Sequence, residues 1–216
     1  MNSKRMLAIA NYVNKSDSVI DVGCDHGYLG IILTEKKMCH NLLLTDVKDT
    51  ALNNAKKNIK THNLDIKTML TNGLDGINLE EYNTVTISGM GTSTILKILA
   101  QLKNDKSISK VIIQSNNNLD ELRKGMQKIG YYLVDETTLF ENNIWYVIMK
   151  FKQGYKRLSY SETQFGLIKK DKKGYYEYLI HNYEKINKLI PRRRILLNLN
   201  VKYKLLILYR LLKECR

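Results

Sequence analysis

The sequence has few of the features that mark membrane, secreted or zinc-binding proteins. It contains one proline and three cysteines, and the cysteines (Cys24, Cys39 and Cys215) are widely spaced, with no C-x-x-C pair. This spacing indicates neither a disulfide framework nor a zinc site. No apolar run approaches the roughly 18 residues that cross a membrane, and the first residues lack the apolar core of a signal peptide. We therefore expect a cytoplasmic protein with no metal site and no membrane contact.

The net charge of +14 is concentrated near the carboxyl end of the chain. Residues 1–150 contain 18 Lys and Arg against 16 Asp and Glu, whereas residues 151–216 contain 17 against 5. A general lysine bias would spread the excess evenly along the chain. The uneven distribution instead favours an anionic partner, nucleic acid before a membrane surface.

Short β-rich runs alternate with helical patterns over the first two thirds of the chain. We expect parallel strands at 19–22, 41–45, 66–70, 84–88 and 110–115, and helices at 3–13, 28–37, 48–62, 93–103 and 118–129. Alternation of this kind predicts right-handed crossovers and a doubly wound α/β sheet with helices on both faces.

The end of this region predicts a reversed strand. Residues 131–138 and 144–152 are strand-like and too close together for a helix between them, so a turn at Glu141, Asn142 and Asn143 should close an antiparallel hairpin. The expected fold is therefore a Rossmann-like seven-stranded sheet with one antiparallel strand, which resembles the sheet of class I methyltransferases.

The chain beyond Gly154 has a helical pattern. Apolar residues recur every three or four positions over 172–189 and 195–212, on either side of Pro191. We predict a coiled-coil helical hairpin, and divide the chain into a cofactor-binding domain (1–154) and a basic helical hairpin (155–216).

The segment SVIDVGCDHGYLG, residues 18–30, has the form of a nucleotide-binding strand, loop and helix. Gly23 ends the strand, and Gly27 lets the backbone approach a ligand at the helix start, with His26 beside it. The spacing is G-x-x-x-G rather than the G-x-G-x-x-G of a dinucleotide site. Asp21 and Asp25 would repel a pyrophosphate but could accept hydrogen bonds from the ammonium group of S-adenosylmethionine. The alternative is a tight turn in which Asp21 caps the helix.

Further polar residues follow the other strands. Asp46 could accept both ribose hydroxyls of an adenosine cofactor, or it could be a solvated acid. Asn72, followed by Gly73, could bond the adenine edge or serve only in a turn. The fourth strand runs into Gly89, Met90 and Gly91, where the cofactor or a flat substrate could approach the backbone.

The fifth strand ends in the polar residues Gln114, Ser115 and Asn116. A buried strand rarely tolerates an unpaired amide, so Gln114 is a candidate functional residue. Asn117 and Asn118 could equally cap the next helix. No general base stands out, and the histidines have no metal-ligand spacing.

Taken together, SKRMLAIA, DVGCDHGYLG, SGMG and QSN resemble the bacterial tRNA (adenine-22-N1)-methyltransferase family over nearly the full length. The chain departs from that family's D-x-G-x-D-H-x-Y-L-P, G-M-G-G and Q-P-N patterns at Gly30, Thr92 and Ser115. Asn72 stands where an acid is typical.

The resemblance implies methyl transfer from S-adenosylmethionine to N1 of an adenine in the tRNA D-arm. Adenine N1 carries no proton, so the reaction needs positioning more than a base, and the adenine must be exposed, as by flipping. The Asn116 amide oxygen and backbone carbonyls around Gly89 are candidates for holding the 6-amino group, and Asp25 for stabilising the cationic product, with Gln114 as a further candidate catalytic residue. Tyr28 could stack on the base or only pack the helix, and Arg5 could contact a phosphate or the cofactor carboxylate, or be solvated.

The basic hairpin would then supply contacts to tRNA phosphates in a monomeric enzyme. The candidate residues are Lys169, Lys170, Lys172, Lys173, Arg192, Arg193 and Arg194.

Three alternative functions stay open: an RNA-binding or assembly factor without enzyme activity, a small-molecule methyltransferase, and an NAD-linked dehydrogenase. Retention of Asp21, Asp25 and Asp46 speaks against the first, the basic hairpin against the second, and the glycine spacing against the third.

Overall fold

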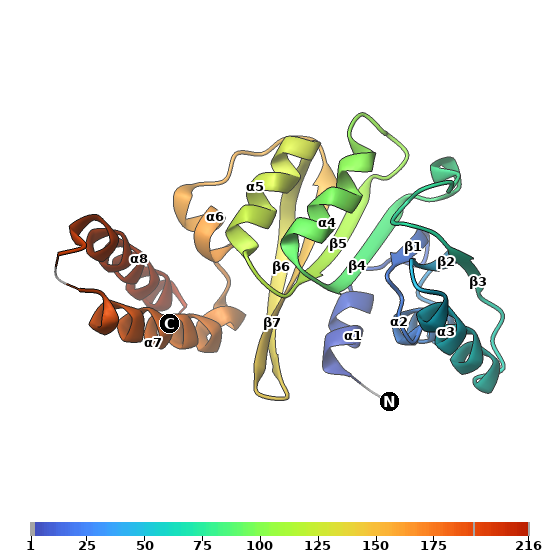
Figure 1. Cartoon of the computed structure of the whole chain (residues 1–216), viewed down its shortest axis with the longest axis horizontal. Coiled ribbons are helices and arrows are strands. Elements are labelled where there is room, and N and C mark those ends of the chain that lie inside the picture. Colours follow the sequence, from blue (N-terminus) through green and yellow to red (C-terminus); the bar gives the residue numbers. More distant parts are fainter. Residues whose placement is uncertain (1–2, 192, 216) are drawn as a thin grey trace.

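A twisted sheet of seven strands forms the centre of the computed structural model, which describes residues 3–191 and 193–215 (Figure 1). The strand order is β3-β2-β1-β4-β5-β7-β6. Among these strands, only β7 runs in the direction opposite to all the others, which confirms the predicted sheet with one reversed strand. The strands are β1 (Ser18–Val22), β2 (Asn41–Asp46), β3 (Lys67–Leu70), β4 (Thr84–Met90), β5 (Lys110–Ser115), β6 (Tyr131–Glu141) and β7 (Ile144–Gln153).

Helices cover both faces of the sheet. On one face, α1 (Lys4–Ala10), α2 (Tyr28–Glu35) and α3 (Asp49–Thr61) share a core with β1, β2 and the middle of β5. On the other, α4 (Thr92–Leu99) and α5 (Leu119–Ile129) pack against β1, β4 and β5. Because both faces are buried, β1, β2 and β5 carry consecutive apolar residues, as parallel strands in such folds do, and β4 buries Thr84 and Thr86 as well. Short 3₁₀ turns at Leu79–Glu81 and Ala100–Leu102 complete this region.

The carboxyl-terminal segment lies beside α5 and the hairpin formed by β6 and β7 (Figure 1). It comprises α6 (Tyr160–Phe165), a 3₁₀ turn (Lys170–Lys172), α7 (Lys173–Leu189) and α8 (Ile195–Glu214), so the predicted hairpin around Pro191 is confirmed. Tyr176, Ile180 and Leu208 belong to the same apolar core as the sheet residues of that face. Within the described part of the chain, no helix combines the length and apolarity needed to cross a membrane.

The reversed strand decides where the β6–β7 turn lies. Gln114 near the carboxyl end of β5 pairs with Ile148, so β7 begins beyond that end of β5. Asn142 and Asn143 form the turn, with φ of 51° and 62°. Two consecutive residues in this conformation are typical of the tight turns that match the twist of a hairpin, and asparagine tolerates it. The turn therefore projects at the sheet edge where β1, β2, β4 and β5 end.

Candidate active site

A cavity of about 1010 Å³ lies at the carboxyl ends of β1, β2, β4 and β5. The chain runs outward from β1 to β2 and β3 and then returns to β4 on the other side of β1. Such a switch point in strand order is where doubly wound sheets bind ligands. The predicted residues that line the cavity are Arg5, Asp21, Gly23, Asp25, His26, Tyr28, Asp46, Asn72, Gly73, Gly89, Met90 and Asn116.

Two glycines shape the loop between β1 and α2. Gly23 and Gly27 have φ of 73° and 72°, a conformation that L side chains rarely adopt. A Cβ atom at Gly23 would lie 2.0 Å from the terminal methyl of Met90, and one at Gly27 would lie 3.1 Å from Cβ of Ala55. The loop is thus tight because of conformation and because of close neighbours. Its nearby aromatic rings, His26 and Tyr28, stack with centroids 5.5 Å apart.

Asp21 is a buried carboxylate at the floor of the cavity. Its side chain accepts a 2.7 Å hydrogen bond from the hydroxyl of Thr86, and the residue is 3% exposed. Burial raises the pKa of Asp21 to about 6, with the Thr86 hydrogen bond lowering it and the nearby Asp46 charge raising it. Asp21 does not cap α2. The N-cap residue of this helix is Gly27, and no side chain makes a capping hydrogen bond there.

Asp46 and Asp25 have different environments. The Asp46 carboxylate accepts the backbone N–H groups of Asp25 at 3.1 Å and Lys48 at 2.9 Å, which fixes it at the end of β2. The side chain of Asp25 is 73% exposed and lies 3.8 Å from the His26 ring. Asp46 is therefore held by the fold, whereas Asp25 is a rim residue in the left-handed region, with φ of 50°.

Amide groups at the carboxyl ends of β4 and β5 form a closed hydrogen-bond ring. The N–H of Gly89 donates to Oε1 of Gln114 at 3.1 Å, and Nε2 of Gln114 donates to Oδ1 of Asn116 at 3.1 Å. Nδ2 of Asn116 then donates to the Gly89 carbonyl at 2.7 Å. The ring satisfies the buried Gln114 amide that the sequence marked as unusual, and connects it to the cavity wall.

One side of the cavity was not expected from the sequence. The side chains of Glu141 and Tyr146 line it from the tip of the β6–β7 hairpin. The predicted reversed strand could have indicated this side, because a strand antiparallel to β5 must begin at the carboxyl end of β5, where the cavity lies. Lys97, Ile98 and Gln101 extend the opposite side, near Asn72 and Gly73.

Two departures from the family pattern contact each other. The hydroxyl groups of Thr92, the first residue of α4, and Ser115, the last residue of β5, lie 2.9 Å apart. The side chain of Asn117 accepts the N–H of Thr92 at 3.0 Å, so it caps α4 rather than the helix that follows it. Asn118 precedes α5 without a side-chain capping bond. Gly91 lies at the N-cap position of α4, near the Asn117 side chain.

The cavity offers no evident nucleophile or metal site. Burial raises the pKa of the Cys24 thiol, and the charges of Asp21 and Asp46 raise it further, so this thiol stays protonated at neutral pH. In the residues that the structure describes, no group of three His, Cys, Asp or Glu side chains could hold a metal ion. The chemistry available here is binding and positioning by carboxylates, amides and backbone groups.

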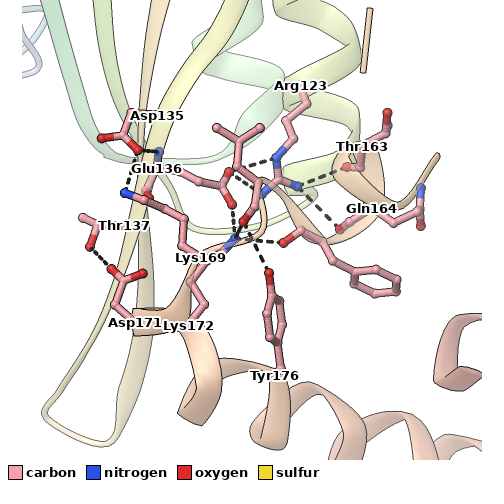
Figure 2. A network of polar contacts seen from close by, with 12 residues as sticks. Arg123, Asp135, Glu136, Thr137, Thr163, Gln164, Lys169, Asp171, Lys172 and Tyr176 are labelled. Atoms are coloured by element: carbon pink, nitrogen blue, oxygen red, sulfur yellow. Dashed lines mark hydrogen bonds and ion pairs between the residues drawn. The ribbon is translucent and has the colours of Figure 1, made fainter. Parts of the chain in front are cut away.

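The prediction that Lys172 contacts a partner's phosphates is wrong. Lys172 is fully buried and its ammonium pairs with Glu136, which also accepts two hydrogen bonds from Arg123 (Figure 2). Carbonyl groups of Phe165 and Leu167 complete the shell of Lys172. The lysine therefore fixes the carboxyl-terminal segment to the sheet instead of facing solvent.

The other predicted basic residues have mixed positions. Lys169 is half-buried and paired with Asp135 at 2.7 Å. Lys170, Lys173, Arg193 and Arg194 are exposed. Arg192 lies outside the described residues. A set of exposed cations thus stays available on the carboxyl-terminal segment.

Comparisons with known proteins identify close similarities. A family described as "Methyltransferase domain" matches residues 2–149. The chain is 28% identical over 162 residues to the tRNA (adenine(22)-N(1))-methyltransferase of Bacillus subtilis (strain 168), covering 73% of this chain and 68% of that protein. The solved structure of M. capricolum TrmK with S-adenosyl-homocysteine is 29% identical, with a TM-score of 0.83 and full coverage of both chains. The B. subtilis m1A22 tRNA methyltransferase TrmK, at 21% identity, shares the fold with a TM-score of 0.81 over 98% of this chain and 99% of that one.

Proposed function

Because this chain belongs to the tRNA (adenine-22-N1)-methyltransferase family, we propose that it methylates N1 of adenine 22 in the tRNA D-arm with S-adenosylmethionine as methyl donor. The observation that carries the proposal is the cavity that joins the buried carboxylates of β1 and β2 to the amide ring of β4 and β5. The end of the cavity with the carboxylates is suited to bind an amino acid and a nucleoside, and the end with the amide ring is suited to bind the edge of a base.

The residues at the cofactor end fit the groups of S-adenosylmethionine. Asp21 would accept hydrogen bonds from the methionine ammonium, and Asp46 from the ribose hydroxyls. Asn72 and Gly73 would border the adenine, and Gly89, Met90 and Gly91 would approach the sulfur end. Gly23, His26 and Gly27 would form the part of the β1–α2 loop that covers the methionine. The carboxylates fit a cation better than a pyrophosphate, which would be repelled by them.

The residues at the other end would position the acceptor adenine. In the transfer, the N1 lone pair forms the new bond to the methyl carbon while the carbon–sulfur bond breaks and leaves its electron pair on sulfur. Asn116 and the Gly89 carbonyl would accept the 6-amino hydrogens, supported by Gln114. Tyr28 would stack on the exposed base, and Asp25 would stabilise the positive charge that forms on it. No base is needed because N1 has no proton to lose.

The carboxyl-terminal segment would bind the tRNA backbone. Lys170, Lys173, Arg193 and Arg194 are exposed, and Lys169 could exchange its partner Asp135 for a phosphate. Phosphate contacts of this kind give affinity without reading sequence. We propose that the 155–216 segment supplies affinity and the 1–154 domain the chemistry, in a monomer located in the cytoplasm.

A labelling experiment tests the proposal. The protein is incubated with methyl-labelled S-adenosylmethionine and tRNA transcripts at low salt, and the product is mapped by mass spectrometry and primer extension. We expect one 1-methyladenosine at position 22 and none in a transcript with guanine there. Absence of RNA labelling would refute the proposal, and absence of cofactor binding in calorimetry would favour an RNA-binding factor.

A further inference from the structure

Arg5 is held in place by partners from three other elements. Its Nη1 donates to Oε1 of Gln114 on β5 at 3.3 Å, and its guanidinium carbon lies 5.1 Å from the ring centroid of Tyr146 on β7. Arg5 lies in the first turn of α1, close to the end of β6. A guanidinium with both a ring and an amide as partners is oriented more tightly than a solvated one.

Glu141 fixes the helix that carries Arg5. Its carboxylate accepts the N–H groups of Lys4 at 2.7 Å and Arg5 at 3.3 Å, and the hydroxyl of Ser3 at 3.0 Å. Desolvation raises the pKa of Glu141, but these three donors and the Arg5 charge together lower it by more. The Glu141 carboxylate therefore stays ionised. The tip of the β6–β7 hairpin thereby caps α1 and sets the position of Arg5 relative to β5.

Arg5 is the charged donor to the amide ring. Oε1 of Gln114 accepts from Arg5 and from the N–H of Gly89, so both of its acceptor directions are used. This leaves Nε2 to donate to Asn116, and Asn116 in turn donates to Gly89. The remaining acceptor capacity belongs to Oδ1 of Asn116 and the carbonyl of Gly89, and both residues line the cavity.

We propose that Arg5 is a positioning residue that acts on the acceptor adenine through Gln114. This inference rests on the proposed function and adds a residue that acts without touching either substrate. The Arg5 hydrogen bond locks the Gln114 carboxamide, and the locked carboxamide holds Asn116 with an acceptor toward the base. A 6-amino purine meets these acceptors with donors, whereas a 6-oxo purine would place its own acceptor against them. Arg5 thus contributes to the choice of adenine and to the alignment of N1.

The assignment differs from a direct contact of Arg5 with a phosphate or with the cofactor carboxylate. If Arg5 contacted a phosphate, replacing it would lower the affinity for tRNA. If it contacted the cofactor carboxylate, replacing it would lower the affinity for S-adenosylmethionine. A positioning role leaves both affinities unchanged and lowers the rate of the bound complex, because small misplacements of the reacting atoms are costly.

The test compares Arg5→Ala, Arg5→Lys and Gln114→Ala with Lys4→Gln, an exposed change on the same helix. Single-turnover rates are measured at saturating tRNA and S-adenosylmethionine, and the two dissociation constants separately. We expect Arg5→Ala to lower the rate about 10- to 100-fold, the range for one lost charge-assisted hydrogen bond, with both affinities within about twofold of wild type. Arg5→Lys should recover part of the rate, and Lys4→Gln should match wild type.

A double variant and a modified substrate separate positioning from general damage. If Arg5 acts through Gln114, the Arg5→Ala/Gln114→Ala double variant is no slower than the slower single variant. A tRNA with purine, which lacks the 6-amino group, at position 22 should be a poor substrate for wild type. In Arg5→Ala, the ratio of the methylation rate on adenine to the rate on purine should be smaller than in wild type. Additive rate losses, an unchanged ratio, or a loss confined to one affinity would overturn the inference. Failure of wild type to methylate any tRNA would instead refute the proposed function.

Discussion

Replacing Asp21 by asparagine should raise the stability of the protein relative to wild type as the pH rises from 4 to 8. The pKa of this buried carboxyl is about 6 in the fold against 3.8 as its ordinary value. Two pH units correspond to roughly 3 kcal/mol, and with 3% exposure little solvent screening reduces that figure. The amide oxygen introduced by Asp21→Asn can still accept the Thr86 hydroxyl bond that Asp21 accepts at 2.7 Å.

The sign of the pH dependence follows from which state binds the proton more tightly. Below pH 3.8 Asp21 is protonated in both states, so its charge costs nothing. Between pH 3.8 and about 6 the unfolded chain loses the proton first, so wild type loses stability as pH rises. Above about 6 the cost is constant. Relative to wild type, Asp21→Asn should therefore gain roughly 2–3 kcal/mol in unfolding free energy between pH 4 and pH 8.

Urea unfolding followed by the fluorescence of Trp145, the single tryptophan, measures this difference at each pH. Any fixed cost of burying the amide cancels, because only the change of the difference with pH is used. Thr86→Val should enlarge the pH dependence of the protein, since it removes the bond that lowers the pKa of Asp21. A difference between Asp21→Asn and wild type that stays flat from pH 4 to pH 8 would refute the reasoning. At pH 8 the same variant should bind S-adenosylmethionine at least about tenfold more weakly if Asp21 accepts its ammonium.

Three further predictions concern the carboxyl-terminal segment. Glu136→Gln should lower the unfolding free energy by about 3–5 kcal/mol, because it leaves Arg123 and Lys172 buried without a counter-charge, and urea unfolding without a shift in midpoint would contradict this. Gly166→Ala should destabilise by at least about 1–2 kcal/mol, since the residue has φ of 82° and a Cβ atom would lie 1.6 Å from Oε1 of Glu136; an unchanged melting temperature would contradict it. Replacing four exposed cations by glutamine should raise the KM for tRNA and flatten its salt dependence while leaving cofactor affinity unchanged, and an unchanged KM at physiological salt would refute their proposed role. The four are Lys170, Lys173, Arg193 and Arg194.

Much of the fold could be predicted from local sequence patterns. The apolar runs and the paired asparagines at 142 and 143 identify the parallel strands and the terminal hairpin, because each depends on neighbours in the sequence. The short helix α6 was missed: its six residues are too few to display a helical period, and its signal is the capping box formed by Ser159 and Glu162.

The candidate site could be predicted where residues follow a strand, and not where they depend on packing between distant elements. Asp21, Asp46 and Asn116 lie at or near strand ends on the same sheet edge, so the pattern brings them together. Lys172 lies among exposed lysines in the sequence, and nothing local shows that its ammonium fits beside Glu136. The Thr92–Ser115 contact likewise joins residues 23 positions apart.

The buried cluster of Arg123, Glu136 and Lys172 has a consequence for the order in which the protein is completed on the ribosome. Lys172 is made 36 residues after Glu136, which at about 5–20 residues per second is roughly two to seven seconds later. In the first part of that interval β7 is still being made, and afterwards the apolar face around Tyr131 and Phe151 still lacks the cover of the carboxyl-terminal helices, while Arg123 and Glu136 lack Lys172. Arrival of α6, Lys172 and α7 then closes the cluster and that face in one step. The nascent chain therefore leaves this apolar face uncovered for a time set by translation speed.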